Sequence, residues 1–121
     1  MMTLKVKSIE MNPSDDEGLA FVYFDLGDLS YFTACYSTVD KDGIYIEYNS
    51  QEQGSYVDRI SYRLVENGVI FEYPQSVSEL IRLESPLLLN FKLADEEFYI
   101  LRECLQTIFH NTYTTPYDIV P

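Results

Sequence analysis

The chain has 121 residues, of which 46% are hydrophobic and 15% aromatic, and 20 acidic against 8 basic residues give a formal net charge of −12. This composition argues against a disordered chain and fits one domain, 1–121, with a core that needs neither metals nor disulfides. The charge argues against nucleic acid and anionic membranes as partners, because phosphates are bound by clustered Lys and Arg. It would attract a basic protein, although acidity alone also serves solubility.

Cysteine usage and the N-terminal sequence bear on the cellular compartment. Cys35 lies in a strand-like run and Cys104 in a helix-like one, so both are expected to be buried thiols in a reducing compartment rather than a disulfide. The first ten residues lack the long apolar run of a signal peptide, and no segment reaches membrane-spanning length. We therefore expect a cytoplasmic protein.

The N-terminal third predicts strands joined by polar turns. Leu4–Met11 alternates as one strand, and the acidic stretch 12–18 follows as a loop. Leu19–Leu26 and Leu29–Ser37 then flank Gly27-Asp28, a two-residue signal for a type II′ hairpin. The polar stretch 38–43 predicts a further turn.

The Gly27-Asp28 turn would pair Phe24 with Tyr31 and Val22 with Thr33 on one face of that hairpin. Both faces carry aromatic residues, so the pattern specifies the register only weakly. The hairpin is therefore either covered on both sides, or one of its faces is a contact surface.

The middle of the chain contains the clearest alternation. Ile44–Tyr48 predicts a half-buried strand, 49–55 a polar loop, and Tyr56–Val65 a further strand. Asn67-Gly68 then predicts a hairpin turn, which would place Leu64 opposite Phe71.

The C-terminal third adds one strand and one helix. Residues 74–84 fit either a helical turn or an irregular edge, whereas Pro86–Leu93 predicts a strand. Asp95–Asn111 predicts an amphipathic helix with Asp95 as its N-cap, and 112–121 an extended tail. The simplest architecture is α+β, an antiparallel sheet of six or seven strands with this helix packed on it. The helix would bury an apolar stripe, Phe98, Leu101, Leu105, Ile108 and Phe109.

Catalytic and metal-binding patterns are weak throughout. The one histidine, His110, lies at the expected helix end, where a basic side chain interacts well with the last carbonyls. Asp40-x-Asp42-Gly43 faintly resembles a calcium loop, but Thr38 and Asn49 stand where that loop needs Asp and Glu. No nucleophile, phosphate-binding or dinucleotide motif appears. We therefore expect no catalytic residues, no metal site and no cofactor.

Acidic and tyrosine residues are the remaining functional signal. The chain has eleven tyrosines and no tryptophan, and tyrosine is enriched at protein interfaces. Tyr45, Tyr48 and Tyr56 surround a polar acidic loop and are as consistent with an interface as with an ordinary sheet. An aromatic face of the 19–37 hairpin could equally serve a homodimer.

The central stretch, Ile44-Tyr-Ile-Glu-Tyr-Asn-Ser-Gln-Glu-Gln-Gly-Ser-Tyr, is followed by a strand, a Glu-Asn-Gly turn, a strand and a helix that ends Leu-Gln-Thr-Ile-Phe. Over roughly Leu19–Phe109 this order resembles the immunity protein 10 family of bacterial polymorphic toxin systems. Glu47 and Gln51 match the acidic residue and glutamine of the family pattern, whereas Ser50 stands in place of an aspartate.

The resemblance implies a non-catalytic cytoplasmic protein that binds a cognate toxin domain and occludes it stoichiometrically. Because the chain is acidic, we expect a basic, nuclease-like toxin. The partner-binding residues that follow are Glu47, Tyr48, Gln51, Glu52 and Tyr56. The alternative is a small acidic regulatory or scaffold domain that has no toxin partner.

Overall fold

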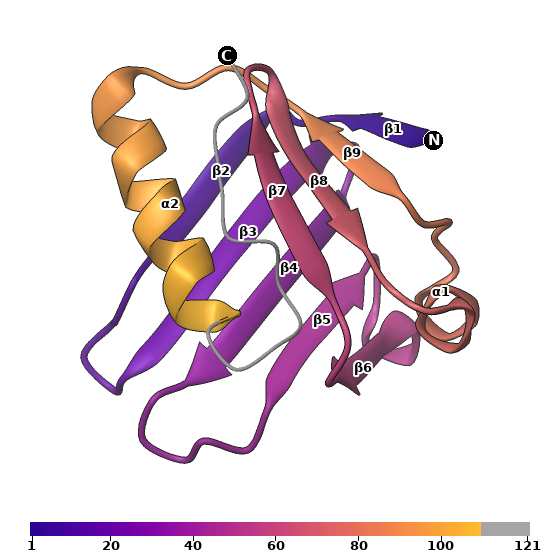
Figure 1. Cartoon of the computed structure of the whole chain (residues 1–121), viewed down its shortest axis with the longest axis horizontal. Coiled ribbons are helices and arrows are strands. Elements are labelled where there is room, and N and C mark those ends of the chain that lie inside the picture. Colours follow the sequence, from indigo (N-terminus) through magenta and orange to yellow (C-terminus); the bar gives the residue numbers. More distant parts are fainter. Residues whose placement is uncertain (110–121) are drawn as a thin grey trace.

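The computed structural model describes residues 1–109 and folds them into strands, two α helices and a short 3-10 helix (Figure 1). The predictions for His110 and for the tail 112–121 lie outside the described residues. The helices are η1 (Gln51–Gln53), α1 (Gln75–Ile81) and α2 (Asp95–Ile108). The strands are β1 (Met2–Lys5), β2 (Ser8–Asn12), β3 (Leu19–Gly27), β4 (Ser30–Ser37), β5 (Ile44–Tyr48), β6 (Gly54–Val57), β7 (Ser61–Val65), β8 (Gly68–Glu72) and β9 (Leu87–Asn90).

These strands form two sheets. One has four strands in the order β1-β9-β8-β7, and the other has five in the order β2-β3-β4-β5-β6. Neighbouring strands are antiparallel except β1 and β9, which are parallel. The predicted α+β class, with mostly antiparallel strands and a C-terminal helix, is confirmed. The predicted single sheet of six or seven strands was wrong.

The chain changes sheet inside two segments that the alternation predicts as single strands. After β1, the amide of Val6 donates to Asn90 O of the four-stranded sheet (2.9 Å), and the next amide, Lys7, donates to Asp25 O of the five-stranded sheet (2.7 Å). Residues 58–60 make the second crossing, between β6 and β7. The alternation slips by one residue at each crossing: two exposed residues follow one another, and the core-facing positions pass from Val6 to Ile9 and from Val57 to Ile60.

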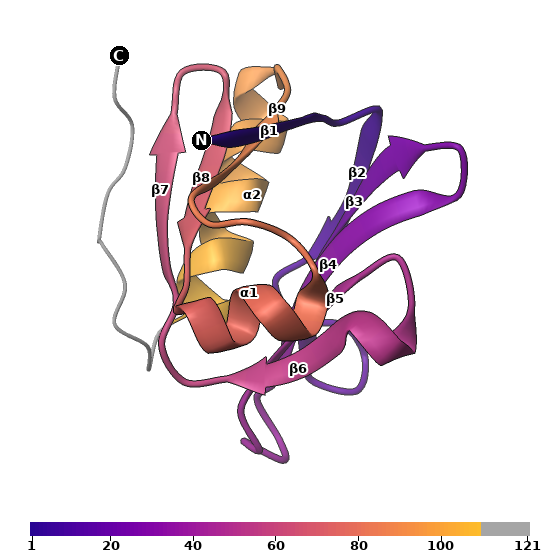
Figure 2. The ribbon, with the colours of Figure 1, turned by 90° about the vertical axis from the view of Figure 1, so that its right-hand side faces the viewer.

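The core lies between the sheets. Phe24 and Phe32 of the five-stranded sheet contact Phe71 of the four-stranded sheet, with ring centroids 6.4 and 5.5 Å apart. Helix α2 packs on β2, β3 and β4, and Phe109 at its end contacts Phe71. In Figure 2, α2 lies between the two sheets. The inner face of the five-stranded sheet is therefore fully used by the core.

The β3–β4 hairpin differs from its prediction by one residue. Asp28 and Leu29, with φ of 52° and 67°, form the two-residue turn, and the register shifts between Asp25 and Gly27. Phe24 consequently pairs with Phe32 rather than with its predicted partner Tyr31. The predicted register was wrong, and its assignment of side chains to faces was wrong with it.

The β7–β8 hairpin is confirmed as an element but not in register. The turn residues are Glu66 and Asn67, and Gly68 begins β8, so Leu64 lies opposite Val69. The two inward faces are unaffected because the pairing shifts by two residues. A Cβ atom at Gly68 would overlap the carbonyl oxygen of Leu89 in β9. Glycine is therefore needed here by the close approach of a neighbouring strand.

Helix α2 confirms the predicted C-terminal helix with a shifted start. Its N-cap is Ala94, and Asp95 is the first helical residue rather than the cap. The carboxylate of Glu97 accepts a hydrogen bond from Ala94 N at 3.4 Å. The predicted stripe is buried at Leu101, Leu105, Ile108 and Phe109 and half-buried at Phe98. The undetermined segment 74–84 contains α1, which buries Val77 and Ile81.

Candidate protein-binding face

Alternate residues of β2 to β6 point away from the core and form what we call the outer face of the five-stranded sheet. Within residues 1–109, no helix or strand lies over this side (Figure 2). The face combines aromatic, hydroxyl and acidic side chains, all half-buried or exposed. Its main members are Glu10, Leu19, Phe21, Tyr23, Tyr31, Thr33, Cys35, Tyr45, Glu47 and Tyr56.

Glu47 lies on the outer face near the end of β5, the strand beside the edge strand β6. It lies opposite Thr33 of β4 on one side and opposite Gly54 of β6 on the other. The Tyr45 hydroxyl donates a hydrogen bond to Glu47 Oε1 at 2.6 Å, and the Tyr31 hydroxyl donates to Oε2. Each carboxylate oxygen is thus held by one tyrosine, and the side chain is fixed above the sheet.

The same contacts raise the pKa of both tyrosines. The pKa of Tyr31 rises from 10.0 to about 12, chiefly because its hydroxyl is hydrogen-bonded to Glu47, with burial and the Glu47 charge adding to the effect. The pKa of Tyr45 also rises to about 12, first through burial and then through its hydrogen bond to Glu47. Both hydroxyls therefore remain protonated donors at neutral pH.

Two aromatic pairs flank this carboxylate. Tyr31 stacks on Tyr23 of β3, with ring centroids 5.2 Å apart and an interplanar angle of 14°. Tyr45 meets the ring of Tyr56 edge-on at 5.3 Å. A Cβ atom at Gly54 would overlap the Tyr45 hydroxyl, so the glycine leaves room for Tyr45 to reach Glu47. The aromatic rings are thus fixed by one another and by the acid between them.

A shallow hollow of about 490 Å³ lies beside Glu47, over β3 and β4. Thr33 and Cys35 contribute small side chains to it, and the Thr33 hydroxyl is occupied by a hydrogen bond to Val22 O at 2.8 Å. The pKa of the Cys35 thiol is raised, first by burial and then by nearby carboxylates, so the thiol stays protonated. The hollow is lined by Glu10, Leu19, Phe21, Tyr23, Thr33 and Cys35.

The five predicted partner-binding residues divide between three places. Glu47 and Tyr56 lie on the outer face, where Tyr45 contacts both of them. Tyr48 lies on the opposite side of the same strand and packs half-buried against the core. Gln51 and Glu52 are exposed on η1, at the end of the sheet. The structure therefore gathers two of the five around Tyr45.

The sequence reasoning missed Tyr31 as a hydrogen-bond partner of Glu47 and Tyr23 as the ring that stacks on Tyr31. Its predicted register put Tyr31 on the same face as Phe24, whereas the actual register puts Tyr31 on the outer face. The available signal was the aromatic content of both hairpin faces, which does predict a contact surface as one of two outcomes. It could not show that Tyr31 reaches a glutamate in β5.

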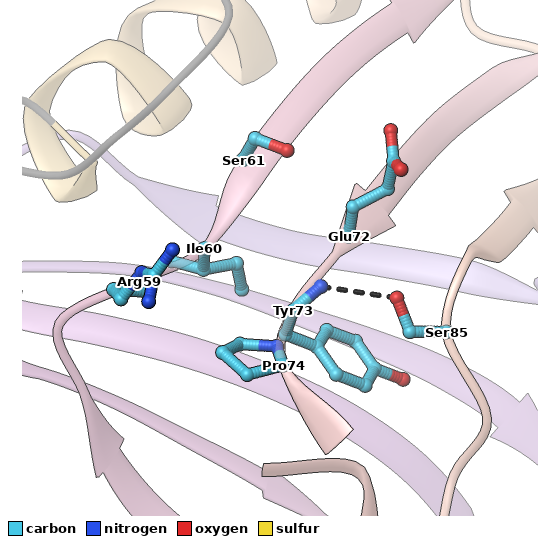
Figure 3. A pocket seen from close by; sticks show the side chains of 7 residues that line it. All are labelled: Arg59, Ile60, Ser61, Glu72, Tyr73, Pro74 and Ser85. Atoms are coloured by element: carbon cyan, nitrogen blue, oxygen red, sulfur yellow. Dashed lines mark hydrogen bonds between the residues drawn. The ribbon is translucent and has the colours of Figure 1, made fainter. Parts of the chain in front are cut away.

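A second hollow, of about 260 Å³, lies where β7 and β8 meet the segment before β9 (Figure 3). Its polar groups serve the fold. Tyr73 N donates to the Ser85 hydroxyl at 3.0 Å, and the Tyr73 hydroxyl donates to Leu83 O and Glu84 O at 2.9 and 3.0 Å. Burial raises the pKa of Tyr73. Arg59 adds a cation at the edge, and we assign no chemistry to this hollow.

Residues 1–109 contain neither a candidate metal site nor a candidate membrane-spanning helix. No group of three or more His, Cys, Asp or Glu side chains in that range could hold a metal ion. None of the helices described there has the length and apolar character needed to cross a bilayer. Cys104 is buried and Cys35 half-buried, and both are free thiols, so the expectation of full burial was wrong for Cys35.

Comparisons with known proteins add no functional assignment. No family model, curated protein or solved structure matches the chain significantly.

Proposed function

We propose that this protein is an immunity protein that binds a cognate bacterial toxin domain and neutralises it by stoichiometric occlusion. The contact surface is the outer face of the five-stranded sheet, and the partner is a basic, nuclease-like domain. One observation carries this proposal: Glu47 is fixed by two tyrosine hydroxyls on an aromatic face over which no helix or strand of residues 1–109 lies.

The aromatic content of the outer face supports protein binding. Tyrosine combines a large rigid contact area with a polar end, and such residues dominate the energetic centres of interfaces. Here the rings are already paired, so little side-chain entropy is lost when a partner covers them. Tyr56 is 59% exposed and has much surface still to bury.

Charge supports a basic partner. The chain carries a net charge of −12, and Glu10 and Glu47 lie on the outer face itself. A negative surface accelerates the encounter with a positive one and disfavours acidic competitors. The toxin as partner rests on the resemblance of residues 19–109 to the immunity protein 10 family, whose members act in the cytoplasm without catalysis.

Binding of the purified chain to the toxin domain encoded beside its gene tests this proposal. We expect a one-to-one complex by calorimetry, and Glu47→Lys should weaken it about 100-fold, because a charge pair at the centre of the contact becomes a repulsion. Tyr56→Ala provides a second variant that leaves the hydrogen bonds of Glu47 intact.

Glu66→Lys is the matched control, because it makes the same charge change in the exposed β7–β8 turn of the other sheet. It should bind and protect like the wild type. If the neighbouring toxin does not bind, a regulatory or scaffold domain is the better description. If the Glu47 and Tyr56 variants bind as well as the control, the outer face is not the contact surface.

A further inference from the structure

The hydrogen bonds of Glu47 leave part of its carboxylate available. An ionised carboxylate has about four acceptor positions, two on each oxygen. Tyr45 occupies one on Oε1 and Tyr31 occupies one on Oε2. One acceptor position therefore remains on each oxygen, and the two tyrosines hold the group in one orientation.

The guanidinium group of arginine matches such a carboxylate. It presents parallel N–H donors in a planar fork, which can reach both oxygens at once, whereas a lysine ammonium is a point charge. Guanidinium planes also stack on aromatic rings, and the rings of Tyr31 and Tyr45 lie on either side of Glu47.

The neighbouring hollow fits the rest of the same side chain. Thr33 lies directly opposite Glu47 across the β4–β5 pair and also lines the hollow. Arginine buries its methylene stem along apolar surface while its charged end stays in a polar site. Phe21 and the protonated thiol of Cys35 supply that apolar surface, and Glu10 adds a second negative charge at the β2 side.

We propose that Glu47, Tyr31 and Tyr45 form a receptor for an arginine side chain of the protein partner, with the stem lying in the adjacent hollow. This inference deepens the proposed function, because it names the group that the outer face recognises. Charge selects this occupant over a second copy of the chain. Two such faces would bring Glu10, Asp25 and Glu47 of each copy against the same acids of the other.

Amide chemical shifts of the full-length, isotopically labelled chain can test the receptor with a small probe. The probe is Nα-acetyl-arginine amide, compared with the lysine and citrulline analogues. We expect saturable shifts at Thr33, Tyr45 and Glu47 with a dissociation constant on the order of millimolar. The lysine probe should bind about tenfold more weakly, and the uncharged citrulline probe should not bind.

Variants distinguish specific binding at Glu47 from nonspecific attraction of the cationic probe to an acidic protein. Glu47→Gln should abolish saturation with the arginine probe, and Tyr31→Phe should weaken it several-fold, because the carboxylate loses one of its two positioning bonds. Glu66→Gln removes the same charge from the β7–β8 turn and should bind like the wild type. The backbone amide spectrum of each variant reports whether it is folded.

Three results would overturn the receptor: equal shifts with arginine and citrulline, unchanged binding in Glu47→Gln, or no saturation at roughly 50 mM probe. A concentration-dependent dimer of the free chain, with its shifts on the outer face, would assign the face to a second copy instead. The probe needs no toxin, so arginine binding without toxin binding would refute the proposed function and leave the receptor standing.

Discussion

The two faces of the five-stranded sheet use aromatic residues in opposite ways. Inside, Phe24 and Phe32 are fully buried, with ring centroids 6.3 Å apart. Outside, their sequence neighbours Tyr23 and Tyr31 stack at 5.2 Å, and Tyr31 bonds to Glu47. The rings are similar in size, and the hydroxyl makes the difference. Phe24 and Phe32 fill the core, whereas Tyr23 and Tyr31 build a surface that is both apolar and hydrogen-bonded.

Loss of an inner ring should have the largest effect. We expect Phe32→Ala to lower the free energy of unfolding by about 3–5 kcal/mol, because it opens a cavity among Phe24 and Phe71. Urea denaturation measures this loss. If Phe32→Ala lowers the free energy of unfolding by less than Tyr23→Ala on the outer face does, the two faces do not differ in the way described.

Loss of an outer ring should affect binding more than stability. Tyr56→Ala should weaken the complex by about 2 kcal/mol, the scale of an interface hot spot, and change stability by roughly 0.5 kcal/mol. Calorimetry with the toxin domain and denaturation of the free chain give the two values. The reverse order would make Tyr56 part of the scaffold.

Gly54→Ala should disturb the contact between the tyrosines and the acid. The new methyl group would overlap the Tyr45 hydroxyl, so Tyr45 must move from Glu47, at a cost of about 1 kcal/mol for one hydrogen bond. The pKa of Tyr45 should then fall from about 12 towards 10. Tyrosinate absorbance against pH measures this shift, which Tyr45→Phe should remove altogether.

Alkaline pH should destabilise the fold through Tyr31, whose pKa is raised chiefly by its hydrogen bond to Glu47, and Tyr45, whose pKa is raised first by burial and then by its bond to Glu47. The folded-state pKa of Tyr31 and of Tyr45 is raised above the unfolded value of 10.0, so the contribution is complete below pH 10 and is lost as the pH rises towards 12. The denaturation midpoint should decline over that window. Tyr31→Phe should flatten the decline, while the effects of the buried Cys104 and Tyr73 remain.

Sequence reasoning recovered the fold class, the central strands and α2, because those depend on periodicity within one element. The predicted strand register failed where a local backbone contact adds a bulge to one strand, because the bulge shifts every cross-strand pair beyond it by one residue. In β3, Asp25 Oδ1 accepts a hydrogen bond from Gly27 N at 2.8 Å where the register shifts, and Leu29 adopts a positive φ that its residue type disfavours. This one-residue error in register placed Tyr31 on the wrong face of the sheet, so its contact with Glu47 was not predicted.

The candidate site was predicted in part for the same reason. Glu47 and Tyr56 share a sheet face by simple alternation along β5 and β6, and both reach it. Tyr48 follows Glu47 directly and so must point to the other side of the strand. Gln51 and Glu52 were grouped with these residues by proximity in sequence, which carries no information once the chain leaves the sheet into η1.

The crossing at Val6 and Lys7 also bears on the order of folding. The five-stranded sheet is one uninterrupted stretch, 8–57, joined by hairpins between successive strands, whereas the four-stranded sheet must bring β1 beside β9. Contacts between segments that are near in sequence form faster, because they close shorter loops. We expect the sheet that carries the outer face to assemble first during synthesis. Its binding surface would then be in place before α2 has covered the other side.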